Sequence, residues 1–172
     1  MIIGRNTMNT AVNTTKVPSI LRELSFSGKL VFDYGCGRCS DLVKKHAYDN
    51  GAVEYRRYDK YWNIGRKPSI AEYRIYDLVI CANVLNVIEN PIERYEVLKD
   101  LSSLISGAKG ATVAIQIYEG DKSGIGRETS KGYQLNRKRA DYYNEIREHF
   151  PVRDFKIREK RNYFIITWRK FI

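Results

Sequence analysis

Apolar residues follow two alternating patterns along the chain. Short apolar runs are typical of buried parallel strands, and they occur at residues 29–33 and 76–82; residues 53–58, before Asp59, and residues 112–118 are predicted to be further strands. Apolar residues at helical spacing predict helices over residues 17–26, 40–49, 91–105 and 138–150. Two last apolar runs flank a turn near residue 161, which predicts a closing antiparallel hairpin over 155–168.

This alternation of strands and helices predicts a particular architecture. Parallel strands joined by helical crossovers give an α/β, doubly wound, Rossmann-like sheet, and the hairpin adds one reversed strand near its end. Residues 16–172 are expected to form this single domain. Residues 1–15 have no apolar periodicity and are expected to be a flexible arm, and residues 119–132 a glycine-rich polar loop.

Composition indicates a globular chain. Hydrophobic residues make up 43% of the 172 residues and charged residues 29%, which is not the mixture of a disordered protein. No apolar run approaches the roughly 20 residues of a membrane-spanning helix, and the first residues carry no secretory segment. The expectation is therefore a cytoplasmic protein that makes no membrane contact.

The three cysteines raise the question of a metal or redox site. Cys36 and Cys39 form a Cys-x-x-Cys pair where a strand gives way to a helix, a position that redox dithiols also occupy. Zinc needs further ligands, and His46 and His149 lie on separate predicted helices without metal-ligand spacing. No metal site is expected, and the glycines around the pair explain the segment better.

Positive charge is concentrated in the last third of the chain. The net charge is +10, and residues 120–172 contribute 14 Lys and Arg against 7 Asp and Glu, or +7. Such a bias favours an anionic partner, above all nucleic acid, through attraction to phosphates. The alternative is a basic surface that only keeps the protein in solution.

The turn after the first predicted strand carries the strongest candidate chemistry. Gly35 and Gly37 permit a close approach of the backbone to a ligand, and amides at the start of the next helix can take a carboxylate. Asp33 ends the buried strand, where a cationic ligand group would offset its desolvation. A ligand with both an ammonium and a carboxylate fits this turn better than a pyrophosphate. Taken alone, Gly-x-Gly is also a common turn.

Two further features follow strands whose carboxyl ends reach the same edge of the sheet. Asp59 ends the second strand, where an acid can accept both hydroxyls of a ribose, and Tyr58 and Tyr61 flank it with aromatic faces. Asn83 and Asn86 follow the strand over 76–82. Taken singly, Asp59 is compatible with a surface turn and the asparagines with helix caps. Their order, each after a strand, favours one binding crevice.

Together these segments resemble the class I S-adenosylmethionine-dependent methyltransferases. Val31–Arg38 looks like the first motif of that family, and Arg57–Trp62 looks like its acidic second-strand motif. Leu85–Arg94 is similar to a stretch in a subgroup of bacterial and phage methyltransferase-like proteins associated with DNA modification. The resemblance runs from about residue 17 to 104 and more loosely through 132–134.

The resemblance implies a sheet of about seven strands and S-adenosylmethionine as the cofactor. In such a protein the glycine loop holds the methionine part, the acid after the second strand holds the ribose, and its neighbours contact the adenine. Residues after the fourth strand of the family's sheet, which corresponds to residues 76–82 here, line the site near the sulfonium. The implied cofactor-binding residues are Asp33, Tyr34, Gly35, Cys36, Gly37, Asp59, Lys60, Tyr61, Ala82, Asn83 and Val84.

Three departures from the family pattern matter. Cys39 stands in place of the third glycine of the loop. Only 18 residues separate Asp59 from Asp77, so the third strand is expected to be abbreviated, and the acid that often contacts the adenine amino group has no counterpart. Neither an Asn/Asp-Pro-Pro-Tyr motif nor a Pro-Cys nucleophile occurs, so the usual base-amino and cytosine-carbon DNA chemistries are unsupported.

The predicted function is S-adenosylmethionine-dependent methyl transfer to a nucleic acid or to a protein bound to it. A sulfonium is already activated, so the enzyme mainly aligns donor and acceptor, and no catalytic residue is assigned. Two alternatives stay open. One is a catalytically degenerate methyltransferase-like module that acts through its basic C-terminal surface. The other is a nucleotide-binding oxidoreductase, suggested by Gly35-x-Gly37-x-x-Ser40.

Overall fold

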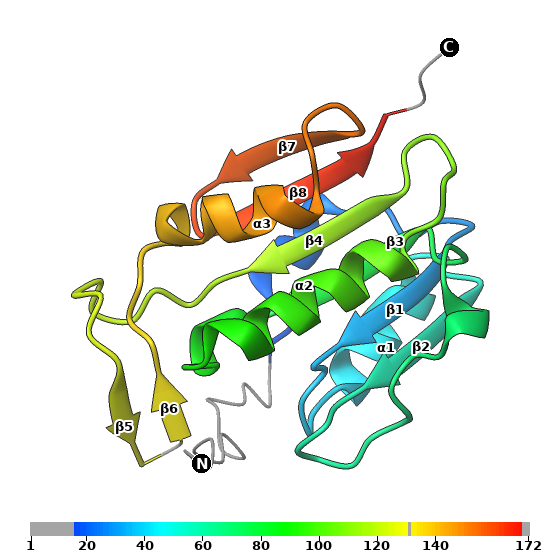
Figure 1. Ribbon diagram of the computed structural model, residues 1–172. Coiled ribbons are helices and arrows are strands. Elements are labelled where there is room, and N and C mark those ends of the chain that lie inside the picture. Colours follow the sequence, from blue (N-terminus) through cyan, green and yellow to red (C-terminus); the bar gives the residue numbers. More distant parts are fainter. Residues whose placement is uncertain (1–15, 131, 170–172) are drawn as a thin grey trace.

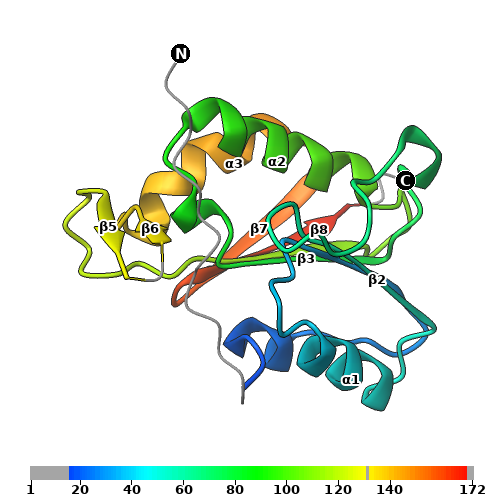
Figure 2. The same ribbon diagram turned by 90° about the horizontal axis from the view of Figure 1, so that it is seen from below.

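The computed structural model describes residues 16–130 and 132–169 and contains a six-stranded sheet with helices on both faces (Figures 1 and 2). Its strands are β1 (Leu30–Tyr34), β2 (Glu54–Tyr58), β3 (Leu78–Ala82), β4 (Thr112–Gln116), β7 (Phe155–Lys160) and β8 (Tyr163–Trp168). They follow the order β2-β1-β3-β4-β8-β7. The first four are parallel, whereas β8 is antiparallel to both of its neighbours. The predicted Rossmann-like sheet with an antiparallel C-terminal hairpin is confirmed.

Two layers of helices bury the sheet. Figure 2 shows α1 (Asp41–Asp49) on one face and α2 (Pro91–Leu104) and α3 (Tyr143–His149) on the other. Side chains of β3 alternate between the two cores: Val79 and Cys81 pack in the cluster that contains α2 and α3, and Leu78 and Ile80 pack in the cluster that contains α1. Both faces of this strand are therefore buried, which explains its continuous apolar run.

Two predicted helices form only in part. The segment over 17–26 contains a short 3₁₀ helix, η1 (Ser19–Glu23), on the α1 face. The segment over 138–150 divides into a 3₁₀ helix, η4 (Arg139–Tyr142), followed directly by α3.

The connection between β2 and β3 adds no strand to the main sheet, so the sheet has six strands and not about seven. Its residues form turns and the 3₁₀ helix η2 (Ile70–Glu72), which leaves β2 as an edge strand. An additional parallel strand here would need two crossovers, one from β2 and one to β3, each of about a dozen residues or more. The 18 residues from Asp59 to Asp77 are too few for two crossovers and a strand. Glu72 instead fastens this connection to β2 through an ion pair with Arg56 at 3.2 Å.

The predicted polar loop at 119–132 is in part a hairpin. Strands β5 (Arg127–Thr129) and β6 (Gly132–Gln134) pair with each other apart from the main sheet (Figure 1). All of β5 is exposed and only Tyr133 of β6 is buried, so neither strand has the apolar alternation by which a sequence predicts strands.

The predicted flexible arm, residues 1–15, lies outside the described residues. The division of the chain into an arm and one domain therefore stays a prediction. None of the helices in the described part of the chain has the length and apolar character needed to cross a membrane.

Candidate functional site

Two adjoining cavities open at the edge where the carboxyl ends of β1 to β4 meet. The first measures about 380 Å³, and we name it the aromatic cavity after its walls, which include Tyr34, Tyr58, Tyr61 and Trp62. The second measures about 820 Å³, and we name it the amide cavity because it is bordered by Asn83, Asn86, Gln116, Gln134 and Asn136. Both cavities share a border made by Gly37, Asn83 and Val87.

Ten of the eleven residues predicted to bind a cofactor border these cavities. Those at the aromatic cavity are Tyr34, Gly35, Gly37, Asp59, Lys60, Tyr61, Asn83 and Val84. Those at the amide cavity are Cys36, Gly37, Ala82 and Asn83. The exception is Asp33, which borders neither cavity. The topology thus brings segments from three strand ends together, as the sequence predicted.

The glycine loop depends on its two glycines for different reasons. Gly35 has a φ of +68°, and a Cβ atom there would lie 2.4 Å from Cγ2 of Val84. Gly37 has a φ of +65°, but a Cβ atom there would meet nothing within 4 Å. Gly35 therefore allows close packing between the loop and the β3 end, and Gly37 provides a turn beside open space.

Asp59 organises the loop through backbone amides. Its Oδ2 accepts a hydrogen bond from the amide of Gly37 at 2.8 Å. Its Oδ1 accepts from the amides of Tyr61 at 2.9 Å and Trp62 at 3.0 Å. A carboxylate has about four lone-pair sites, so three bonds leave about one for a ligand hydroxyl. Asp59 is thus first a clamp between β2 and the glycine loop.

Asp33, which the sequence predicts to contact a cationic ligand group, borders neither cavity. Its side chain is 3% exposed, and the hydroxyl of Tyr55 donates to its Oδ2 at 2.5 Å. Burial raises the pKa of Asp33 to about 7. A tyrosine hydroxyl from the chain itself thus satisfies one oxygen of Asp33. The strand pairing brings the two together, because Asp33 lies opposite Arg57, two residues from Tyr55.

The cysteine pair lies at the border of the amide cavity. Cys36 and Cys39 both contribute to its wall. Burial raises the pKa of the Cys36 thiol to about 12, so it is protonated at neutral pH and is a poor nucleophile. Within residues 16–130 and 132–169, no group of three or more His, Cys, Asp or Glu side chains is placed to hold a metal ion.

Side-chain amides tie the amide cavity together. Asn83 has a positive φ of 61°, and its backbone amide donates to the carbonyl of Gln116 at 2.8 Å. Asn86 is 2% exposed; its Nδ2 donates to Gln134 Oε1 at 3.1 Å, and its Oδ1 accepts from the amide of Tyr118 at 3.3 Å. These bonds fix β3, β4 and β6 to one another around the cavity.

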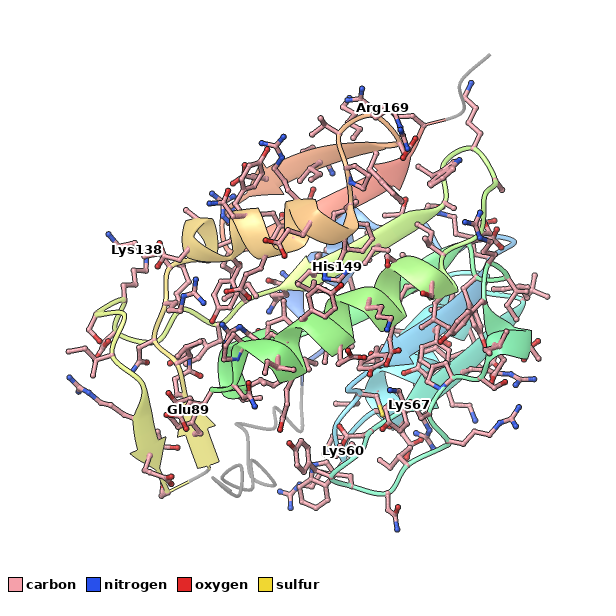
Figure 3. The ribbon with its side chains drawn as sticks, viewed as in Figure 1. Lys60, Lys67, Glu89, Lys138, His149 and Arg169 are labelled. Carbon is pink, nitrogen blue, oxygen red and sulfur yellow. The ribbon has the colours of Figure 1, made fainter. Side chains whose placement is uncertain are left out.

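Several residues of the aromatic cavity were not predicted from the sequence. Glu93, Glu96 and Asp100 of α2 border the aromatic cavity, as does Lys67 of the β2–β3 connection. Lys60 and Lys67 lie on the same side of the molecule in Figure 3. The spacing of the three acids places them on one face of a helix, which is the one sequence signal that they share.

These features define the class of fold: a Rossmann-like sheet with a glycine loop after β1, an acid after β2 and a ligand-sized cavity at their junction. No protein-family model matches the sequence, and no curated protein sequence matches it significantly. Solved structures, however, match its fold.

A S-adenosylmethionine-dependent methyltransferase from Archaeoglobus fulgidus is 14% identical, has a TM-score of 0.58, and matches over 87% of this chain and 90% of its own. One from Mesorhizobium loti is 11% identical, with a TM-score of 0.56, over 88% of this chain and 96% of its own. A Rhodobacter sphaeroides structure described as a Zn-dependent alcohol dehydrogenase is 11% identical, with a TM-score of 0.62, and matches over 95% of this chain and 96% of its own.

The chain therefore has the fold of S-adenosylmethionine-dependent methyltransferases. At these identities the likeness establishes the fold alone, and a structure described as an enzyme of another class shares it. Activity has to be inferred from the site, because one fold hosts many reactions.

Proposed function

We propose that the protein is an S-adenosylmethionine-dependent methyltransferase. The observation that carries this proposal is the junction of the two cavities at Gly37, Asn83 and Val87. Residues of the aromatic cavity would hold the adenosine of such a cofactor, and those of the glycine loop would hold its methionine part. The amide cavity would admit the acceptor, so that the two would meet at the shared border.

The residues present fit such a cofactor. Tyr61 and Trp62 offer aromatic faces to a base, and Val84 and Val87 offer an apolar wall. Asp59 retains an acceptor site for a ribose hydroxyl beside its three amide bonds. When bound, the cofactor supplies a methyl group already activated on a sulfonium.

The chain itself contributes alignment. The positive φ of Asn83 directs the β3 end around the junction, and its amide bond to the carbonyl of Gln116 holds that turn at 2.8 Å. Such fixed positions favour an in-line approach of the acceptor.

For the acceptor we propose a nucleic acid, or a protein bound to one. Side-chain amides that donate and accept match the edges of bases, and Tyr118 borders the amide cavity with 56% of its surface exposed, which suits stacking on a base. The basic residues Lys156, Arg158 and Lys160 alternate along the edge strand β7.

This basic row leads toward the amide cavity. Phe155 and Ile157 of β7 pack in the core that contains α3, so the alternate basic side chains project to the opposite face. On that face Lys160 pairs with Glu23 of η1 at 2.7 Å. Arg22, beside Glu23, borders the amide cavity. This position of the row supports the proposal that it binds the phosphates of a strand whose base enters the cavity.

Titration calorimetry tests the cofactor and labelled methyl transfer tests the reaction. The full chain is expected to bind S-adenosylmethionine and S-adenosylhomocysteine at micromolar concentrations. Absence of heat at millimolar ligand would refute the proposal. Transfer of labelled methyl groups to RNA, single-stranded DNA or a protein fraction then identifies the acceptor.

A second candidate is a catalytically degenerate module that binds nucleic acid through the basic row. The observation that favours it is that Asp33 and Asp59 are both engaged within the chain, by Tyr55 and by three backbone amides. Gel-shift and methyl-transfer assays on the same nucleic acids separate the two candidates, because binding without turnover supports this one.

A further inference from the structure

The aromatic cavity has one buried acid whose role the proposed function does not explain. Asp100 lies on α2 and is 5% exposed, whereas Glu96, one turn earlier on the same face, is exposed. Both border the cavity. A carboxylate held at such depth needs donors to offset its desolvation.

Two donors reach Asp100, and both bind the same oxygen. The hydroxyl of Tyr34 donates to Oδ2 at 2.7 Å, and the ammonium of Lys67 lies 3.2 Å from Oδ2. Burial raises the pKa of Tyr34, so its hydroxyl stays a donor at all physiological pH values. In the described part of the chain, no hydrogen bond to the other oxygen, Oδ1, is found.

The three residues come from three elements that meet only in this fold. Tyr34 ends β1, Lys67 belongs to the short β2–β3 connection, and Asp100 lies in the second half of α2. The bonds to Tyr34 and Lys67 fix the carboxylate from two sides. Such fixation favours a single orientation for any group that binds Oδ1.

The walls of the aromatic cavity, which Asp100 borders, define the ligand group that suits its free oxygen. Tyr34, Tyr58 and Trp62 give the cavity aromatic walls, which suit a flat ring. A carboxylate oxygen accepts hydrogen bonds and repels other acceptors. The complementary group is therefore an N–H at the edge of a heteroaromatic ring, and a ring carbonyl in that place is unfavourable.

We infer that Asp100 is a specificity-determining residue that accepts a hydrogen bond from the 6-amino group of the adenine base through Oδ1. This inference rests on the proposed function, since adenine is there as part of the cofactor. Tyr34 and Lys67 act as positioning residues for Asp100.

The test compares two ligands on the full chain by titration calorimetry. S-adenosylhomocysteine carries the 6-amino group, and its deaminated analogue S-inosylhomocysteine carries a carbonyl oxygen there. The unsubstituted protein is expected to bind the adenosyl compound about 10- to 100-fold tighter, because a hydrogen bond to a charged group is replaced by a repulsion.

Variants assign this selectivity to a residue. Asp100→Asn is expected to reduce the affinity ratio to a few-fold, since an amide can accept from an amino group or donate to a carbonyl. Tyr34→Phe is expected to lower the ratio partly, because it removes one bond that orients Asp100. Asp49→Asn makes the same change at an exposed end of α1 that borders neither cavity, so it is the matched control and is expected to leave the ratio unchanged.

Each outcome is decisive. Equal binding of both ligands by the unsubstituted protein overturns the inference but leaves the proposed function intact. An unchanged ratio in Asp100→Asn overturns the assignment to Asp100. Binding of neither ligand by the unsubstituted protein refutes the proposed function and this inference with it. If Asp100→Asn does not fold, the ligand comparison and Tyr34→Phe still decide.

Discussion

The Oδ2 atom of Asp59 accepts a hydrogen bond from the amide of Gly37 at 2.8 Å, across 22 residues of sequence. This side-chain bond joins the end of β2 to the glycine loop, in addition to the backbone bonds that the amides of Gly35 and Cys36 donate to the carbonyl of Tyr58. It explains why an acid after β2 and a glycine after β1 depend on each other even before any ligand binds.

Replacing Asp59 is therefore expected to affect both stability and cofactor binding. Asp59→Ala leaves three backbone amides without their acceptor, which costs about 1–3 kcal/mol of unfolding free energy. It also loosens the loop, so affinity for S-adenosylhomocysteine is expected to fall at least about tenfold. Urea unfolding and calorimetry measure the two effects. Asp49→Ala, at the exposed end of α1, is the control, and an equal loss of affinity there would contradict the role of Asp59.

The two loop glycines are expected to differ in their tolerance of a side chain. Gly35→Ala combines a left-handed backbone with a methyl group 2.4 Å from Val84, whereas Gly37→Ala adds only the backbone strain of about 1–2 kcal/mol. Gly35→Ala is therefore expected to be the more destabilising by urea unfolding. Adding Val84→Ala to Gly35→Ala is expected to recover part of the loss, and strictly additive effects would contradict the predicted clash.

Asp33 is expected to make stability depend on pH. Its pKa rises from 3.8 to about 7 on folding because the carboxyl is buried. Between these values the folded state binds the proton more than the unfolded state does, so this contribution to stability is full below pH 3.8 and is lost as the pH rises through 7.

Asp33→Asn is expected to remove that dependence while it keeps an acceptor for Tyr55. The measurement is urea unfolding of both proteins at a series of pH values from 4 to 8. As the pH rises, the unsubstituted protein should lose unfolding free energy relative to Asp33→Asn. A constant difference over this range would show that Asp33 does not titrate as proposed. Asp49→Asn serves as the exposed control.

Arg94 is expected to be a main support of the segment that walls the cavities. It is 5% exposed and binds both carboxylate oxygens of Glu145, at 2.8 and 3.0 Å, while its Nη1 donates to the carbonyls of Ile88 and Glu89. Arg94→Ala is expected to cost about 1–3 kcal/mol, because the carbonyls of Ile88 and Glu89 lose this donor and Glu145 keeps only its bond from Arg137. Arg94→Lys should restore little of this, since it cannot form the two-pronged bond. Urea unfolding that shows full rescue by lysine would contradict this geometry.

The sequence predicted those features of the fold and site that depend on residues close together in the chain. The glycine loop, Asp59 and Asn83 each follow a strand, and parallel strands bring their carboxyl ends to one edge by necessity. The continuous apolar run of β3 likewise predicts its own burial on both faces. These parts of the fold and site could be found without coordinates.

Other parts depend on contacts between distant segments. Tyr34 and Asp100 are separated by 66 residues, and no spacing rule pairs a strand-end tyrosine with a helix acid. The engagement of Asp33 by Tyr55 depends on the strand register, which fixes which side chains meet. The β5–β6 hairpin has too little apolar pattern to be recognised. Such features emerge only when the register and the helix orientation are known.

The basic row on β7 gives the sharpest test of the proposed acceptor. Lys156 and Arg158 project from an edge strand on the face opposite Phe155. Charged residues on edge strands also protect against aggregation, so their presence alone does not demonstrate binding. Contacts with phosphates differ from such protection because they release counterions and make affinity depend on salt.

The double variant Lys156→Glu, Arg158→Glu is therefore expected to weaken binding to single-stranded RNA or DNA and to reduce the slope of log affinity against log salt by about 2. Fluorescence anisotropy at 50 to 200 mM salt measures both. Lys44→Glu, Lys45→Glu on α1 changes the net charge equally and is the control. If both double variants weaken binding alike, the effect follows from total charge and β7 is not the contact. If only the β7 variant loses affinity and slope, while its binding of S-adenosylhomocysteine is unchanged, the row holds the acceptor's backbone.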